Sequence, residues 1–148
     1  MPKEAPQMRK STIGDAVSDA IGEIQALAEE MREAYDNTPE SLQSSGVGEA
    51  RGEAADNLEQ IEEPDVPEEL KDIPVEILDP KPRKRGYSRA SRRDQSVYIL
   101  DVVIDALNTH IDAPDVSQDI KDTAETFRDD LENVKDNAEC VEFPGMFG

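Results

Sequence analysis

The sequence predicts an all-α protein in which helical hairpins form a small bundle of about four helices. Four separate stretches carry apolar residues at alternating spacings of three and four, which is the period of an amphipathic helix. Segments that contain glycine and proline separate these stretches. The heptad-like stripes of the first and fourth helices equally permit a dimer with a shared core.

The first helix follows residues 1–10, which we expect to form a flexible N-terminus. Ser11 or Thr12 can cap it, and Asp15 suits its first turn because the helix dipole favours acids there. We expect the helix to end near Tyr35. Its apolar stripe contains Ile13, Val17, Ala20, Ile24, Leu27, Met31 and Ala34.

A loop that contains Gly46 and Gly48 joins this helix to a second, shorter one. One helical turn is expected at residues 39–42, and the second helix is expected within residues 50–63. Half of its inward positions are small, so it can pack closely against the first helix. These inward residues are Ala50, Ala54, Leu58 and Ile61. Residues 11–63 are therefore predicted to form an acidic helical hairpin.

Residues 64–90 form a proline-containing connector that runs into a basic segment. Ile73, Val75 and Ile77 alternate with other residues, which fits either a short strand or a polyproline II segment. The basic segment, residues 80–93, carries seven positive side chains and no acid, whereas the rest of the chain carries nine positive and thirty-five negative ones. Its positive residues are Lys81, Arg83, Lys84, Arg85, Arg89, Arg92 and Arg93.

The second helical hairpin is expected over residues 91–139. Ser91 and Asp94 have the spacing of a capping box, so the third helix, the most apolar element, is predicted to begin there. Asp112 or Asp115 can cap the fourth helix after the break at DAPDV. The apolar stripe of the fourth helix contains Val116, Ile120, Ala124, Phe127, Leu131, Val134 and Ala138.

The composition indicates a protein of a reducing compartment. Its net charge of −19 at pH 7 should repel naked nucleic acid overall. No apolar run approaches the roughly 20 residues of a membrane-spanning helix, and the first residues lack the apolar region of a signal peptide. The single cysteine, Cys140, rules out an internal disulfide. We therefore expect a cytoplasmic protein that does not enter membranes, with a flexible apolar tail at residues 140–148.

The sequence contains no recognisable catalytic or metal-binding motif, so we expect no catalytic residue, metal or cofactor. The only histidine, His110, lies near a helix C-terminus, where it suits the helix dipole. No serine or cysteine has an adjacent histidine to activate it. The stretch DAPDVSQD, residues 112–119, lacks the glycine and the glutamate of a calcium loop. These observations favour a binding protein over an enzyme.

Acidic residues line the outer faces of the first and fourth helices. Asp15, Asp19 and Glu23 stand about 6 Å apart along the helix axis, and duplex DNA carries a phosphate about every 3.4 Å per strand, so such rows can imitate part of its potential. A merely solvated face, including one from a salt-adapted cell, is the alternative. The candidate partner-binding residues are Asp15, Asp19, Glu23, Glu30, Glu33, Asp119, Asp122, Asp129 and Asp130.

The basic segment contains a conflict that suggests anion binding. Arg92 and Arg93 would lie in the first turn of the third helix, where the dipole disfavours cations. A bound anion would relieve the conflict. It could come from the protein's own acidic faces, from a partner, or from nucleic acid phosphates with Tyr87 available for stacking. A flexible, solvated linker is the remaining alternative. All seven positive residues of the segment are candidates for anion binding.

The stretches LAEEMREAYDNTPESLQSS and EAADNLEQIEEPDVPEEL resemble those of small acidic proteins predicted from bacteriophage genomes. The resemblance covers roughly residues 20–70 and carries no motif from which a site residue could be transferred. It implies a phage protein that acts in the cytoplasm of a bacterial host. Such proteins include inhibitors of host defence nucleases that present DNA-like acidic surfaces.

These observations lead to two main functional hypotheses. In the first, the acidic helical faces bind and block a basic, nucleic-acid-binding protein of the host. In the second, the chain is a dimeric structural or assembly adaptor whose basic residues 81–93 hold nucleic acid or a neighbouring subunit. An enzyme that uses clustered carboxylates and a divalent metal is a third alternative.

Overall fold

Helix α1 (Ile13–Asp36) is the central element of the computed structural model, which describes residues 6–143. Thr12 caps it, with its hydroxyl accepting a hydrogen bond from the Asp15 amide at 3.3 Å. The predicted apolar stripe is buried except at Ala34, which is half-buried. Helix α1 packs against α3 (Gly46–Glu59) on one side and α4 (Arg89–Asp112) on the other.

The second helix of the first hairpin begins earlier than predicted. Ser45 caps α3 by accepting a hydrogen bond from the Gly48 amide at 3.3 Å, so two of the glycines that indicated a loop lie inside the helix. Gly48 is buried beneath the single-turn helix α2 (Glu40–Gln43), where a Cβ atom would lie 2.3 Å from the Leu42 carbonyl oxygen. The glycine is needed for close approach of two backbones. Residues 50–59 of α3 fall within the predicted range, and the helix begins four residues before it.

The second hairpin is present, but both of its helices are capped by serines other than the residues predicted. Ser88, and not Ser91, caps α4, because its hydroxyl accepts a hydrogen bond from the Ser91 amide at 3.1 Å. Helix α5 (Gln118–Glu139) is capped by Ser117, and not by Asp112 or Asp115. The helices α4 and α5 pack closely against each other.

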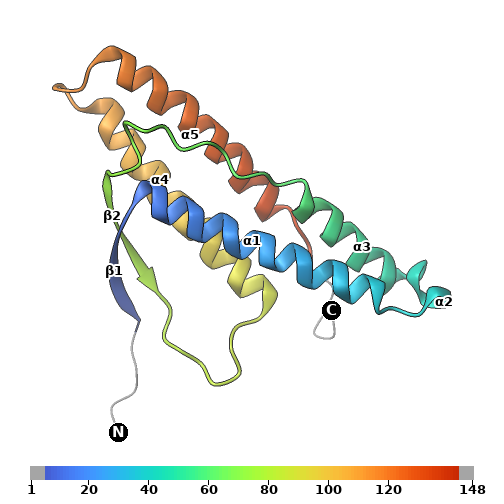
Figure 1. Ribbon diagram of the computed structural model, residues 1–148. Coiled ribbons are helices and arrows are strands. Elements are labelled where there is room, and N and C mark those ends of the chain that lie inside the picture. The colour runs from blue at the N-terminus through green and yellow to red at the C-terminus, as the bar shows by residue number, and fades with distance from the viewer. Residues whose placement is uncertain (1–5, 144–148) are drawn as a thin grey trace, which may run out of the picture.

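A two-stranded antiparallel sheet makes the all-α prediction wrong in part (Figure 1). Strand β1 (Gln7–Thr12) pairs with β2 (Pro74–Asp79) in a register that sets Gln7 opposite Asp79. The prediction of a flexible N-terminus is therefore wrong for residues 7–10, and residues 1–5 lie outside the described part. The strand alternative was correct for residues 74–77, and Ile73 lies just before β2.

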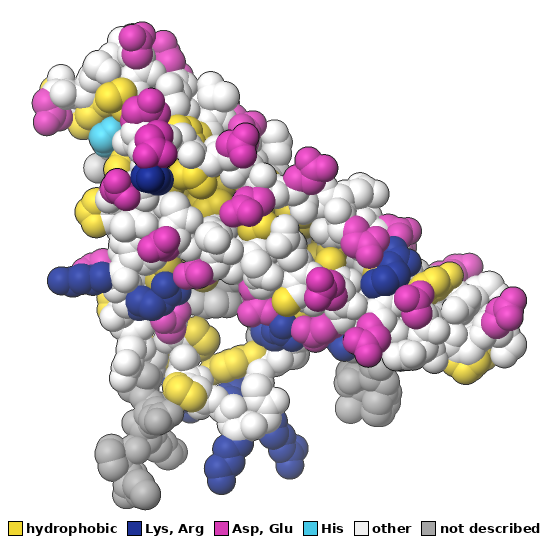
Figure 2. All heavy atoms as spheres, in the orientation of Figure 1, with side chains coloured by type: hydrophobic (Ala, Val, Ile, Leu, Met, Phe, Trp, Pro, Cys, Tyr) yellow, Lys and Arg dark blue, Asp and Glu magenta, His cyan; other side chains and the backbone are white. Residues whose placement is uncertain are grey.

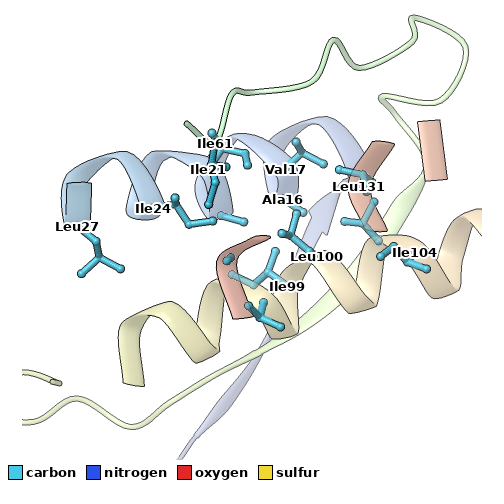
Figure 3. Close-up of a cluster of buried hydrophobic side chains, with 14 of the residues drawn as sticks. Ala16, Val17, Ile21, Ile24, Leu27, Ile61, Ile99, Leu100, Ile104 and Leu131 are labelled. Carbon is cyan, nitrogen blue, oxygen red and sulfur yellow. The ribbon is translucent and has the colours of Figure 1, made fainter. Parts of the chain in front are cut away.

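The core lies where α1, α4 and α5 meet, and β2 contributes to it. Figure 3 shows side chains from α1 and α4 pointing toward one another, with Leu131 of α5 beside them. In β2, Val75 and Ile77 face this core. The chain after α5 also packs on it, because Val141 is only 2% exposed. The prediction of a flexible tail is therefore wrong for residues 140–143, while residues 144–148 lie outside the described part.

Both long apolar stripes are covered within a single chain. The stripe of α1 contacts α3 and α4, and the stripe of α5 contacts α4. A shared-core dimer is therefore not needed to bury them. None of the helices among residues 6–143 is long and apolar enough to cross a membrane.

Candidate functional site

The structure divides the basic segment into two parts with different surroundings. Arg89, Arg92 and Arg93 lie on the first turns of α4 and contact the body of the protein. Lys81, Arg83, Lys84 and Arg85 lie on the loop between β2 and α4 and are exposed. We call residues 80–88 the basic loop; dark blue side chains project from it at the bottom of Figure 2.

Two of the arginines on α4 bind acidic residues of α1. Arg92 Nε lies 2.9 Å from Glu23 Oε1, and Arg92 Nη1 lies 2.9 Å from Glu30 Oε1. Arg89 Nε adds a contact of 3.3 Å to Glu30. The hydrogen bond from Arg92 holds the pKa of Glu30 below its ordinary value, because it stabilises the ionised carboxylate. The anion expected near the start of this helix is therefore supplied by the protein itself.

Arg93 has a different role, at the end of α5. Its Nη1 atom donates to the carbonyl oxygens of Ala138 at 3.1 Å and Val141 at 2.7 Å. The last carbonyls of a helix lack partners inside the helix, so Arg93 satisfies groups that would otherwise need solvent. Its guanidinium also lies 5.5 Å from the centre of the Phe143 ring. Arg93 thus attaches the C-terminal end of α5 and residues 141–143 to α4.

Contacts within the basic loop hold its backbone, and its four basic side chains are exposed. Tyr87 donates its hydroxyl to the Lys81 carbonyl oxygen, and the Arg83 guanidinium lies 4.9 Å from the Tyr87 ring centre. Gly86 has a φ angle of +68°, a conformation that glycine adopts readily, and its amide donates to the Arg83 carbonyl at 3.1 Å. Among residues 6–143, no carboxylate pairs with Lys81, Arg83, Lys84 or Arg85 within 4.0 Å. The loop therefore presents unneutralised positive charge.

A cavity of about 730 Å³ lies between the basic loop, the two strands, α1 and α4. Arg9 of β1 holds its edge, with Nε 2.8 Å from Asp79 Oδ2 and Nη1 3.2 Å from Asp19 Oδ2. The hydrogen bond to Asp79 raises the pKa of Arg9. The residues that line the cavity include Lys81, Arg83, Tyr87, Gln95, Ser96 and Ile99.

The acidic face predicted on α1 is largely occupied by these internal contacts. Asp19, Glu23 and Glu30 are ion-paired with arginines of β1 and α4. Asp15 and Glu33 are exposed and form no side-chain ion pair within the described residues. Three of the five acids predicted on α1 as partner-binding residues are therefore engaged within the chain, by arginines of the basic segment and of β1.

Helix α5 carries a continuous stripe of seven exposed acids at intervals of three or four residues, which we call the α5 acidic stripe. It spans about 30 Å, with one carboxylate about every 5 Å. Lys135 lies 4.0 Å from Glu139 and Arg128 lies 3.3 Å from Asp129, and the other five acids have no cation within 4.0 Å among the described residues. The stripe consists of Asp119, Asp122, Glu125, Asp129, Glu132, Asp136 and Glu139.

Four acids on this helix were predicted as site residues, and all four are exposed. Asp119, Asp122 and Asp129 belong to the α5 acidic stripe, and Asp130 lies beside it. The prediction missed the other four members of the stripe, although their spacing of three and four was visible in the sequence. Figure 2 shows further acidic side chains spread over the same side of the molecule.

No family model, curated protein or solved structure matches the chain. Among residues 6–143, no group of three or more His, Cys, Asp or Glu side chains is placed to hold a metal ion. His110 is half-buried in the last turn of α4, and Cys140 is exposed at the end of α5. The charged surfaces are therefore the features that bear on function.

Proposed function

We propose that this protein is a non-enzymatic binding protein whose α5 acidic stripe occupies a cationic, nucleic-acid-binding surface of another protein. The continuity of the stripe carries the proposal. Seven carboxylates on one face of a helix give about two-thirds of the charge per length of one DNA strand, which has a phosphate about every 3.4 Å. A helix that is packed along its length against α4 holds these charges in fixed positions.

The surroundings of the stripe support a role in binding over a role in solubility alone. Arginines neutralise some acids elsewhere, as at Glu30 on α1 and at Glu59, where the hydrogen bond from Arg32 lowers the pKa of the carboxyl group, whereas others such as Asp15 and Glu33 have no ion pair among the described residues. Five members of the stripe lack such a partner among the described residues, so their negative potential extends into solvent. The resemblance of residues 20–70 to bacteriophage proteins supports a host defence protein as the partner.

Neutralisation of the stripe tests the proposal. In the variant Asp122→Asn, Glu125→Gln, Glu132→Gln and Asp136→Asn, four exposed acids become amides of the same shape. Immobilised wild-type protein should retain nucleic-acid-binding proteins from bacterial lysate at low salt, release them at high salt, and release them when duplex DNA is added. The variant should retain at least tenfold less.

The matched control carries Glu49→Gln, Glu53→Gln, Glu62→Gln and Glu63→Gln, which removes the same charge from exposed positions on α3 and the segment after it. It should retain the partner nearly as well as the wild type. Equal loss in both variants would mean that only total charge matters, and the proposal would then be wrong. Capture that survives high salt, or that duplex DNA does not reverse, would also contradict it.

The adaptor function is the second candidate, and the exposed cations of the basic loop favour it. If the loop carried the main function, replacing Lys81, Arg83, Lys84 and Arg85 by glutamine would abolish capture. If the α5 acidic stripe carries it, that replacement should leave capture unchanged or strengthen it, because it removes positive charge that a cationic partner must approach.

A further inference from the structure

We propose that the cavity beside the basic loop binds a nucleoside phosphate, either as a free nucleotide or as one unit of a single strand. The site is separate from the α5 acidic stripe, and the proposal does not depend on the function of that stripe. The cavity has a volume of about 730 Å³. That is within the range of about 300–1,000 Å³ that is usual for pockets that bind small molecules.

Two cations in the cavity wall lack a carboxylate partner. Four acids line the cavity, and arginines bind all four of them. Arg9 binds both Asp19 and Asp79, Arg92 binds Glu23, and Arg93 Nε lies 2.7 Å from Asp94 Oδ1. Lys81 and Arg83 also line the cavity, and neither has a carboxylate partner within 4.0 Å among the described residues. The acids and the basic side chains of the lining balance in charge, but Lys81 and Arg83 remain available to bind a phosphate group.

The side chain of Ser96 on α4 gives the second, independent indication. Ser96 is only 1% exposed, and it lines the cavity. Its hydroxyl forms no hydrogen bond within residues 6–143, whereas Thr109 of the same helix bonds the carbonyl four residues earlier at 3.1 Å. The hydroxyl of so deeply buried a serine usually has a hydrogen-bond partner. A ligand oxygen or nitrogen in the cavity would supply that partner.

The remaining lining suits the planar part of a nucleotide. Tyr87 and Ile99 contribute aromatic and aliphatic surface to the lining. Bases stack on aromatic rings and on arginine planes, and Arg83 already lies over the Tyr87 ring. A ligand that joins a phosphate to a planar base therefore matches the polar and apolar parts of the wall better than a bare anion does.

Binding measurements on the full-length protein at low salt test the proposal with four probes. AMP, adenosine and inorganic phosphate are titrated by calorimetry. A fluorescein-labelled single strand of about ten nucleotides is titrated by fluorescence anisotropy. AMP should bind at least tenfold more tightly than adenosine or phosphate alone. If the strand binds more tightly than AMP, the source is a nucleic acid; if AMP binds as tightly as the strand, it is a free nucleotide. Binding of neither AMP nor the strand would overturn the proposal.

Variants separate the cavity from the general charge of the loop. Lys81→Gln with Arg83→Gln should weaken AMP binding at least tenfold. Lys84→Gln with Arg85→Gln removes the same charge from the same loop at positions that do not line the cavity, and it should change AMP binding less than about twofold. Equal effects would show that the loop attracts anions without a site.

Ser96→Ala keeps the loop intact and removes only the hydroxyl, so it remains informative if the Arg83 variant alters the loop. It should weaken AMP binding about fivefold, as expected for loss of one hydrogen bond, with thermal unfolding unchanged or slightly improved. Unchanged AMP affinity in this variant would contradict the proposed site. The stripe variant of α5 should bind AMP as the wild type does, so the two proposals can fail independently.

Discussion

Arg92 and Glu30, sixty-two positions apart in the chain, form a salt bridge between α4 and α1, with Nη1 2.9 Å from Oε1. Glu23 lies on the other side of the same guanidinium. This contact joins the basic segment to the acidic first hairpin. It explains part of the positive charge of the basic segment in a chain of net charge −19, because three of its arginines lie in the first turns of α4 and attach that helix to its neighbours.

The Arg92–Glu30 pair should contribute measurably to stability. In a double-mutant cycle with Arg92→Ala and Glu30→Gln, we expect a coupling free energy of about 1 kcal/mol in urea unfolding, since both side chains are partly exposed and solvent screens the pair. Arg92→Lys should recover only part of it, because the N–H groups of a lysine share one nitrogen, whereas the guanidinium reaches the two glutamates from different nitrogens. Strict additivity of the two single variants would show that the pair contributes nothing.

The same pair predicts a pH dependence. Because Arg92 lowers the pKa of Glu30 in the folded protein from its ordinary value of 4.5, the unfolded chain binds more protons as the pH falls through this region. The stabilisation is therefore complete above about pH 5 and is lost as the pH falls through the folded pKa. The difference in unfolding free energy between wild type and Glu30→Gln should shrink between about pH 6 and about pH 3.

The control for this pH dependence is Glu33→Gln, one turn along α1. Glu33 is exposed and has no ion pair with another described residue. Its variant should follow the wild-type curve over the same pH range. A parallel shift of both variants would attribute the effect to net charge and not to the salt bridge.

Two helical glycines should respond to alanine in opposite directions. Gly22 in α1 is exposed, and a Cβ there would meet nothing within 4 Å, so Gly22→Ala should stabilise the protein by about 0.5–1 kcal/mol. Gly48→Ala would place its Cβ 2.3 Å from the Leu42 carbonyl oxygen and should destabilise it by about 1–3 kcal/mol. Thermal unfolding followed by circular dichroism measures both. A stable Gly48→Ala variant would show that α2 does not lie against α3.

Adjacent residues of β2 test the sheet. Ile77 is fully buried whereas Leu78 is 43% exposed, as expected for neighbours on opposite faces of a strand. Ile77→Ala should lower the unfolding free energy by about 2–5 kcal/mol, and Leu78→Ala by less than about 1 kcal/mol. Similar costs for the two variants would contradict the strand and favour an extended segment without a buried face.

Much of the helical architecture could be predicted from the sequence, because helix formation depends on residues within one or two turns. The apolar stripe of α1 follows from spacings of three and four, and its cap, Thr12, was one of the two residues predicted. The start of α3 was missed because its glycines indicated a loop, and the starts of α4 and α5 were missed because several serines and aspartates near each boundary can cap a helix. The pattern locates the helix but does not choose among caps.

Tertiary structure alone decided which charges remain available. Whether Glu23, Glu30 and Asp19 face solvent or an arginine depends on contacts between residues up to seventy positions apart, such as Arg9 with Asp79. The pairing of β1 with β2 and the cavity beside the basic loop have the same origin. The period of a sequence reports which face of an element is apolar, because that follows from local backbone geometry. It cannot report which distant element covers that face, because that choice is made by the packing of the whole chain.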